Sequence, residues 1–213
     1  MTQAKYRNVF FDVDSTLVTI EGIDVLGRGD PAIAKLTEAA MNGEVPVDEV
    51  YGRRLDLIRP ARSDVDALGR QYCTSIVDGA EEGLGRLREA DVQIHLVTAG
   101  IAQAIEPLAA RLKVARRAVH AVAVRFDDAG NYADFDRRSP LVRSGGKAAV
   151  VRDVRARAKG NAAFVGDGVT DLETKSTVDL FIGFGGVRVR QRVKENADVY
   201  VTDFRDVVSH LFA

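Results

Sequence analysis

The sequence VFFDVDSTL, residues 9–17, joins a wholly apolar run to two aspartates one residue apart and then to two hydroxyl side chains. A short continuous apolar run, here residues 7–12, is typical of a parallel strand that is covered on both faces. In an open α/β sheet, ligands bind beyond the carboxyl ends of such strands. The pattern therefore predicts an α/β fold with Asp12 and Asp14 at a ligand-binding edge.

Further apolar runs predict more strands of the same sheet, at residues 92–98, 162–167, 179–185 and 198–203. Helix-like segments follow most of them, and this β-α-β alternation indicates a Rossmann-like open sheet that is mostly parallel. Two strand-like runs around an Asp-Asp-Ala-Gly-Asn turn predict a β-hairpin over residues 119–136. Pro107 lies inside the otherwise helical segment 101–114, where it predicts a kink or a break.

Between residues 17 and 77 the sequence predicts helices and no strand. Asp30 and Pro31 are typical of a helix start, and Asn42-Gly43 of its end. Two further helices are expected, one between Pro46 and Pro60 and one from Ser63. An all-helical insertion directly after the first strand cannot lie inside the sheet. We therefore expect a helical cap domain at 17–77 over a core domain formed by residues 1–16 and 78–213.

Composition limits the functions to be considered. A chain of 213 residues is long enough for one substantial core, and its net charge of −1 gives no global attraction to nucleic acid or to anionic lipid. Cys73 is the single cysteine, which excludes an intramolecular disulfide and a cysteine-built zinc site. No signal-peptide or membrane-spanning pattern is present, so a cytoplasmic protein is expected. The arginines at 188, 190 and 192 are expected to form one solvated edge of a helix.

A second acidic cluster strengthens the case for chemistry at the sheet edge. Alone, Asp12 and Asp14 favour a solvated loop over a catalytic site, since aspartates are common in turns and caps. The segment FVGDGVTD, however, places Asp167 and Asp171 after another apolar strand. Four carboxylates at one edge repel each other unless a cation neutralises them. Oxygen ligands favour a hard divalent ion, and Mg²⁺ also works together with substrate phosphates.

Two other segments have the features of a phosphate site. LVTAG, residues 96–100, offers the Thr98 hydroxyl and the backbone amides of Ala99 and Gly100 near a predicted helix start. SGGK places Lys147 in the first turn of a helix after two glycines. Each feature by itself is more typical of a turn or a surface charge, but together with the aspartates they indicate phosphate chemistry.

These residues carry a resemblance to a known family. Asp12-x-Asp14-x-Thr16, Thr98, Lys147 and Gly166-Asp167-Gly168-x-x-Asp171 stand in the order and strand context of the four motifs of the haloacid dehalogenase superfamily of phosphohydrolases. Within it, the chain closely resembles the phosphoserine phosphatases over nearly its whole length, in segments such as EGIDVL, AMNGEVP and RLDLIRP. The resemblance implies a Mg²⁺-dependent enzyme that hydrolyses L-phosphoserine through an aspartyl-phosphate, as the last step of serine synthesis.

The resemblance also implies roles for single residues. Asp12 is expected to be the nucleophile and Asp14 the general acid and base, while Lys147 and Thr98 stabilise charge on the phosphoryl group. The expected metal ligands are the Asp12 side chain, the Asp14 carbonyl and Asp167, with Asp171 orienting waters or the lysine.

Substrate recognition is expected from Glu21 for the ammonium group, Arg54 for the carboxylate and Met41 as an apolar wall, beside Thr98, Ala99 and Gly100. Without the family resemblance, Glu21, Arg54 and Met41 favour structural roles: a first-turn helix carboxylate, a solvated charge and core filling.

The sequence departs from the family at Thr98 and Ala99, where the usual residues are serine and glycine. Threonine keeps the hydroxyl, but the added methyl of Ala99 leaves the substrate less certain than the reaction. Two alternatives therefore remain. One is a phosphatase or phosphotransferase for another small phosphorylated metabolite. The other is a non-catalytic receiver domain, which has no need of a helical cap or of an acid two residues after the nucleophile. A homodimer is also open.

Overall fold

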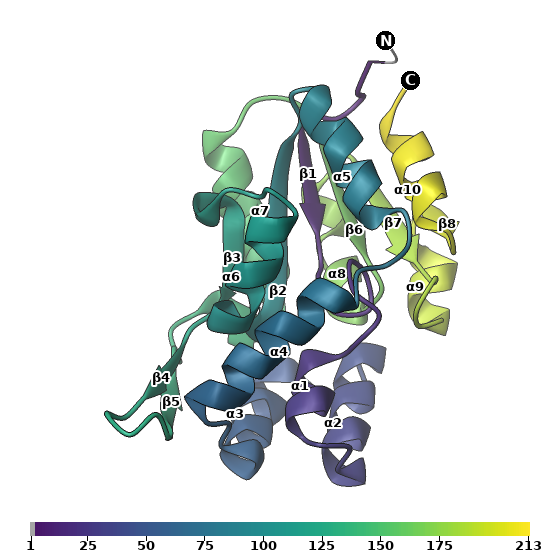
Figure 1. Ribbon diagram of the computed structural model, residues 1–213. Helices are drawn as coiled ribbons and strands as arrows, with labels where there is room; N and C mark the ends of the chain where they lie inside the picture. Colours follow the sequence, from purple (N-terminus) through teal and green to yellow (C-terminus); the bar gives the residue numbers. More distant parts are fainter. Residues whose placement is uncertain (1–2) are drawn as a thin grey trace.

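The computed structural model describes residues 3–213 and has a sheet of six strands at its centre (Figure 1). The strands are β1 (Asn8–Phe11), β2 (Gln93–Ile101), β3 (Val119–Val122), β6 (Ala162–Gly166), β7 (Leu180–Phe184) and β8 (Val199–Val201). Their order is β3-β2-β1-β6-β7-β8, and every neighbouring pair is parallel. The prediction of an open, mostly parallel α/β sheet is confirmed.

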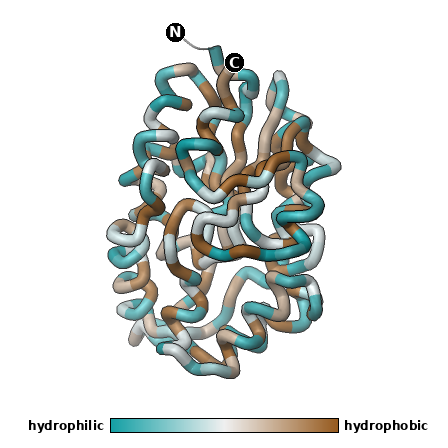
Figure 2. The backbone as a smooth tube through the Cα atoms, turned by 90° about the vertical axis from the view of Figure 1, so that its right-hand side faces the viewer, coloured by the Kyte–Doolittle hydropathy of each residue, from teal (hydrophilic) through white to brown (hydrophobic). Residues whose placement is uncertain are grey.

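The central strands are buried on both faces, as their apolar runs predicted. All four residues of β1 are buried, and Figure 2 shows that brown, hydrophobic segments pass through the middle of the molecule as well as along parts of its outer turns. Side chains of one face form a row of stacked rings across five neighbouring strands. In this row the Phe10 ring lies 4.8 Å from the ring of His95 and 6.4 Å from that of Phe164. His95 and His120 therefore serve packing, as expected from their place in strand-like runs.

Helices cover the two faces of the sheet. On one face α5 (Ala80–Glu89) packs beside α10 (Phe204–Leu211), whose Phe204 ring lies 6.0 Å from that of Phe11. On the other face, α7 (Gly146–Arg157) lies next to the two stacked histidines. The remaining connections contain α6 (Ala102–Arg111), α8 (Val169–Leu172), α9 (Gln191–Asn196), and the 3₁₀ turns η1 (Arg116–Ala118), η2 (Pro140–Val142) and η3 (Lys175–Thr177).

Four helices separate β1 from α5, and they lie beyond the carboxyl end of β1, away from both termini (Figure 1). They are α1 (Gly22–Leu26), α2 (Pro31–Asn42), α3 (Val47–Ile58) and α4 (Arg62–Thr74). Helix α2 has the predicted ends: the Asp30 side chain accepts a hydrogen bond from the Ala32 amide at 2.8 Å, and Gly43 adopts φ 73°.

Two predicted features agree only in part with the structure. The hairpin is shorter than 119–136, because its first residues join the sheet edge as β3, and only β4 (Val124–Phe126) and β5 (Tyr132–Phe135) form the antiparallel pair. Pro107 does not break α6, in which it occupies the second turn. Its ring packs against Gly69 of α4, where a β-carbon would come within 3.2 Å. Packing thus offsets the hydrogen bond that proline removes.

No helix within residues 3–213 has the length and apolar character needed to cross a membrane.

Candidate active site

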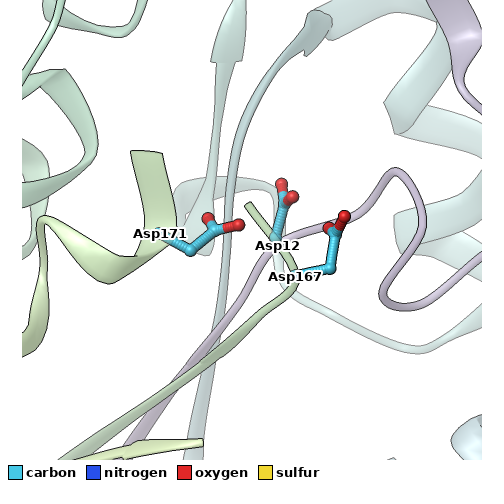
Figure 3. Close-up of side chains that lie close together, drawn as sticks. All are labelled: Asp12, Asp167 and Asp171. Carbon is cyan, nitrogen blue, oxygen red and sulfur yellow. The ribbon is translucent and has the colours of Figure 1, made fainter. Parts of the chain in front are cut away.

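Three buried carboxylates meet at the carboxyl edge of the sheet (Figure 3). Asp12 follows β1, Asp167 follows β6, and Asp171 belongs to α8. Their exposed fractions are 5%, 2% and 0%, and carboxylate oxygens of the three lie within 4.8 Å of one another. Adjacent parallel strands create this proximity, since residues that follow β1 and β6 leave the sheet at the same edge.

Lys147 lies between two of these carboxylates. Its Nζ atom is 2.7 Å from Asp12 Oδ1 and 2.7 Å from Asp171 Oδ1. Burial alone lowers the pKa of this ammonium, but the two carboxylates outweigh burial and raise its pKa above the ordinary value. The lysine is therefore a fixed positive charge next to Asp12.

Three carboxyl groups of the site have raised pKa values. Burial and repulsion from Asp171 raise the pKa of Asp12 well above its usual value and that of Asp167 to about 6. Burial and repulsion from Asp14 and Asp167 raise the pKa of Glu21 to about 8. Burial is the largest cause of each shift and neighbouring carboxylates add to it, so a cation bound between these groups would favour their ionised forms.

A hard divalent cation fits this donor set. Asp12, Asp167 and Asp171 offer only oxygen atoms, and the three side chains are buried close together. Oxygen ligands are those that Mg²⁺ and Ca²⁺ prefer. The buried acidic cluster is thus capable of holding a metal ion.

Asp14 differs from the other carboxylates of the site in its hydrogen-bond partners. Its Oδ1 atom accepts hydrogen bonds from the Gly22 amide at 2.8 Å and from the Tyr72 hydroxyl at 2.7 Å. Burial raises the pKa of Asp14, although both hydrogen bonds lower it. Asp12 and Asp14 thus present two carboxyl groups from one loop in two different environments.

Thr98 and Gly100 lie near the end of β2, before α6 begins at Ala102. The Gly100 amide donates to Thr98 Oγ1 at 2.9 Å. The sequence predicted that this amide is free to bind an anion. In the structure it fixes the Thr98 hydroxyl instead. The hydroxyl keeps its own proton to donate.

The residues of segment 17–77 predicted for substrate recognition line one pocket together with the residues of the catalytic motifs. The predicted residues that line it are Asp12, Asp14, Glu21, Met41, Arg54, Thr98, Ala99, Gly100, Lys147 and Asp167. Asp171 lies outside this lining and reaches the pocket only through Lys147.

Glu21 and Arg54 are held by neighbouring hydroxyl groups. The Ser15 hydroxyl donates to Glu21 Oε1 at 2.6 Å, and Ser15 itself adopts φ 53°. Arg54 is 4% exposed and donates to Thr37 Oγ1 at 3.2 Å, while its Nε atom has no partner among residues 3–213. A buried guanidinium with an unused donor suits an anionic ligand.

Arg190 corrects one expectation and is a residue that sequence reasoning missed. Instead of lying on a solvated edge, it is 3% exposed, and its Nε atom donates to Asp167 Oδ2 at 3.1 Å. Its Nη1 atom donates to Glu38 of α2 at 3.0 Å. The alternation of arginine with valine in GGVRVRQRV gives no sign of this burial, since the residue precedes α9 and is directed inward by tertiary packing.

The parallel α/β fold and the site at its sheet edge, which contains the buried aspartates, Thr98 and Lys147, define a class of enzyme. A family model described as haloacid dehalogenase-like hydrolase matches residues 9–174, and the chain belongs to this family.

Relatives with assigned functions show which members of this family the chain is similar to. The chain is 38% identical to phosphoserine phosphatase of Mus musculus, over 95% of this chain and 92% of that protein. It is 36% identical to the chloroplastic phosphoserine phosphatase of Arabidopsis thaliana, over 95% of this chain and 71% of that protein. Among solved structures, a phospho-aspartyl intermediate analogue of phosphoserine phosphatase shares the fold, with a TM-score of 0.84, 22% identity, and coverage of 99% of this chain and 100% of the other.

Proposed function

We propose that the protein hydrolyses L-phosphoserine to L-serine and phosphate through a phosphorylated Asp12. The observation that carries this proposal is that residues of the catalytic motifs line one pocket together with Glu21 and Arg54 of the helical segment. The phosphoserine phosphatase names of relatives that match nearly the whole chain support the same substrate.

Mg²⁺ is the proposed metal, held by the Asp12 side chain, the Asp14 carbonyl and Asp167. When bound, it supplies positive charge that polarises the phosphoryl group. Asp171 is proposed to act on Lys147, since its Oδ1 atom lies 2.7 Å from Nζ and its Oδ2 atom accepts from the Gly168 amide at 2.9 Å.

In the first half-reaction an Asp12 oxygen attacks phosphorus, and the bond from phosphorus to the serine oxygen breaks. Asp14 gives a proton to this departing oxygen. In the second half-reaction, Asp14 takes a proton from the water that attacks the phosphorylated Asp12. Lys147 and the Thr98 hydroxyl stabilise the charge on the phosphoryl oxygens, and such fixed donors supply most of the rate enhancement in phosphoryl transfer.

Selectivity is proposed to come from the charges above the phosphate. Glu21 binds the ammonium group, whose positive charge favours the ionised carboxylate, and Arg54 binds the substrate carboxylate through its planar fork. Met41 forms the apolar wall. The usual glycine is Ala99 here, and its carbonyl accepts a hydrogen bond from Tyr51 at 2.9 Å, so this position also contacts the helical segment.

Residues 17–77 are proposed to act as a cap domain over the core formed by 1–16 and 78–213. The pocket lies between the two parts, because Glu21, Met41 and Arg54 of the helical segment line it together with Asp12 and Lys147 of the core. Movement of the helical segment relative to the sheet edge is proposed to admit the substrate. The cytoplasmic location and a homodimer stay predictions.

A phosphate-release panel with Mg²⁺ tests the proposed substrate. We expect fast, repeated turnover of phosphoserine and much slower turnover of phosphoethanolamine, which lacks the carboxylate that Arg54 binds. Phosphothreonine and sugar phosphates are the other arms. Equal rates for phosphoserine and phosphoethanolamine would remove Arg54 from its role, and a faster sugar phosphate would favour the alternative of another small metabolite.

Two variants separate the chemistry from the recognition. Asp12→Asn should abolish phosphate release from every substrate, because no nucleophile remains. Glu21→Ala should raise KM for phosphoserine far more than it slows an aryl phosphate without an ammonium group. Turnover that stops after one phosphate per protein would favour the receiver alternative, which membership of a hydrolase family already argues against.

A further inference from the structure

Tyr72, a residue of α4 to which the sequence assigned no role, contacts the carboxyl group proposed as general acid and base. The side chain is fully buried, and its hydroxyl lies 2.7 Å from Asp14 Oδ1. Tyr72 also lines the pocket that holds the catalytic residues. A buried phenol hydroxyl requires a partner, and here the partner is the Asp14 carboxylate.

The two oxygens of Asp14 have different surroundings. Oδ1 accepts two hydrogen bonds, from the Gly22 amide and from the Tyr72 hydroxyl. Oδ2 lies on the pocket side, 3.4 Å from the point that a β-carbon on Gly100 would occupy. In a carboxylic acid the oxygen that accepts hydrogen bonds is the carbonyl oxygen, and the proton sits on the other. The two donors on Oδ1 therefore assign the transferable proton to Oδ2.

Gly22 makes this arrangement possible in two ways. Its amide supplies the second donor to Oδ1 at 2.8 Å. A β-carbon at this position would overlap the Tyr72 hydroxyl, so only glycine lets the phenol reach the carboxylate. Gly22 begins α1 and Tyr72 is near the end of α4, so two separate helices of the segment 17–77 fix one catalytic side chain.

We propose that Tyr72 is a positioning residue for Asp14: its hydroxyl fixes the carboxyl group so that Oδ2 alone exchanges protons with the substrate. This inference rests on the proposed acid and base role of Asp14. As the bond between phosphorus and the serine oxygen breaks, that oxygen takes the bonding electron pair and the proton of Oδ2. As water later attacks phosphorus and the bond to Asp12 breaks, Oδ2 regains a proton from the water.

Because Tyr72 belongs to α4, the acid is oriented only while α4 is packed against the core. Release of the helix would remove the Tyr72 hydroxyl from Oδ1 and leave the Asp14 side chain free to rotate. Efficient proton transfer would therefore occur only while α4 is packed against the core.

The test compares two substrates that differ in their need for an acid. The leaving group of phosphoserine is the serine alkoxide, which needs a proton, whereas that of p-nitrophenyl phosphate is a stable phenolate, which needs none. The parameter is kcat/KM, which reports the steps up to departure of the leaving group. Tyr72→Phe should lower kcat/KM for phosphoserine about 10-fold to 100-fold, part of the usual general-acid contribution of roughly 10²–10⁴. It should change the value for p-nitrophenyl phosphate less than about threefold, which also shows that the variant is folded.

Tyr51→Phe is the matched control, because Tyr51 lines the same pocket but its hydroxyl donates to the Ala99 carbonyl at 2.9 Å. Any loss in this variant should be equal for both substrates. Gly22→Ala, which displaces the phenol, should reproduce the selective loss of Tyr72→Phe.

A third comparison tests whether Tyr72 acts through Asp14. Tyr72→Phe should cause no further loss of kcat/KM for phosphoserine in an Asp14→Asn background. If Asp14→Asn lacks the selective loss, the proposed function of Asp14 fails. Two other results would overturn only the inference on Tyr72. One is a selective loss in Asp14→Asn without a selective loss in Tyr72→Phe. The other is a further loss of kcat/KM when Tyr72→Phe is added to Asp14→Asn.

Discussion

Lys147 is a buried cation held between Asp12 and Asp171, at 2.7 Å from each carboxylate. Removing one partner of a buried ion pair leaves charge that neither protein nor water compensates, at a cost of about 3–5 kcal/mol. We therefore expect Lys147→Ala to lower the free energy of unfolding by about this amount in urea titrations without Mg²⁺. Phosphate release should be lost in the same variant.

The matched control is Lys175→Ala. The Lys175 ammonium lies 2.9 Å from Asp198, but its side chain is 42% exposed. An exposed pair of this kind contributes about 0–1 kcal/mol. Equal losses of stability in the two lysine variants would contradict the claim that the charge of Lys147 balances buried carboxylates.

His95 gives the protein a predicted sensitivity to acid. Burial lowers the pKa of His95 from 6.5 to about 4, with repulsion from His120 adding to the shift. Between pH 6.5 and 4 the unfolded chain therefore binds more protons than the folded one. The stability that depends on neutral His95 is complete above pH 6.5 and is lost as the pH falls toward 4.

We expect His95→Phe to reduce the loss of unfolding free energy between pH 7 and pH 5, measured by urea titration. His95→Gln is the control, because it removes the titrating group without restoring the ring that stacks on Phe10. Both variants should show the smaller pH slope, while only His95→Gln loses stability at pH 7. An unchanged slope in both would be evidence against this account.

At the scale of an element, α2 connects sequence signals to the site. It carries Met41, which lines the pocket, and Glu38, which pairs with Arg190. Asp30 caps its first turn through the Ala32 amide. Asp30→Ala should therefore lower the unfolding free energy by about 1 kcal/mol, within the usual 0.5–2 kcal/mol for an N-cap.

Lys35→Ala, at an exposed position of the same helix, is the comparison. It should change the unfolding free energy by no more than about 0.5 kcal/mol. A larger effect than that of Asp30→Ala would show that the cap is not what holds the end of α2.

Local chemistry explains which elements the sequence predicted well. The start and end of α2 follow from a capping aspartate, a first-turn proline and a terminal glycine, all of which act within a few residues. The first half of the predicted hairpin failed because residues 119–122 pair with β2, more than twenty residues earlier. A strand-like run shows that a strand will form, but its partner depends on which sheet edge is open.

At the scale of the whole molecule, the buried cluster of Asp12, Asp167 and Asp171 predicts stabilisation by metal. A ligand that binds only the folded state adds about 2.7 kcal/mol at a hundred times its Kd. For a chain of this size that corresponds to roughly 5–10 °C in Tm. We expect Mg²⁺ to raise Tm by this amount over chelated protein.

Asp167→Asn should remove most of this rise, whereas Asp198→Asn, at a carboxylate 37% exposed and away from the site, should keep it. Identical Tm values with Mg²⁺ and with chelator, or a full rise in Asp167→Asn, would exclude metal binding at the acidic cluster.

The candidate site shows the same division between local pattern and packing. Asp12, Asp167 and Lys147 were predictable, because each follows a strand or begins a helix at a known edge of the sheet. Arg190 and Tyr72 were not. Both are polar residues on segments whose pattern predicts solvent exposure or core filling, and both are turned inward by contacts with residues more than twenty positions away.

The sequence by itself determined the parallel sheet, the helices inserted after β1 and the edge at which the acidic residues gather, because hydrophobic periodicity and capping act over short distances. Only the tertiary structure decided which hydroxyls and cations hold those acids. Tertiary packing determines three of these hydrogen bonds: Ser15 to Glu21, Tyr72 to Asp14 and Arg190 to Asp167. Each buried carboxylate requires a donor, and the fold decides which donor lies close enough.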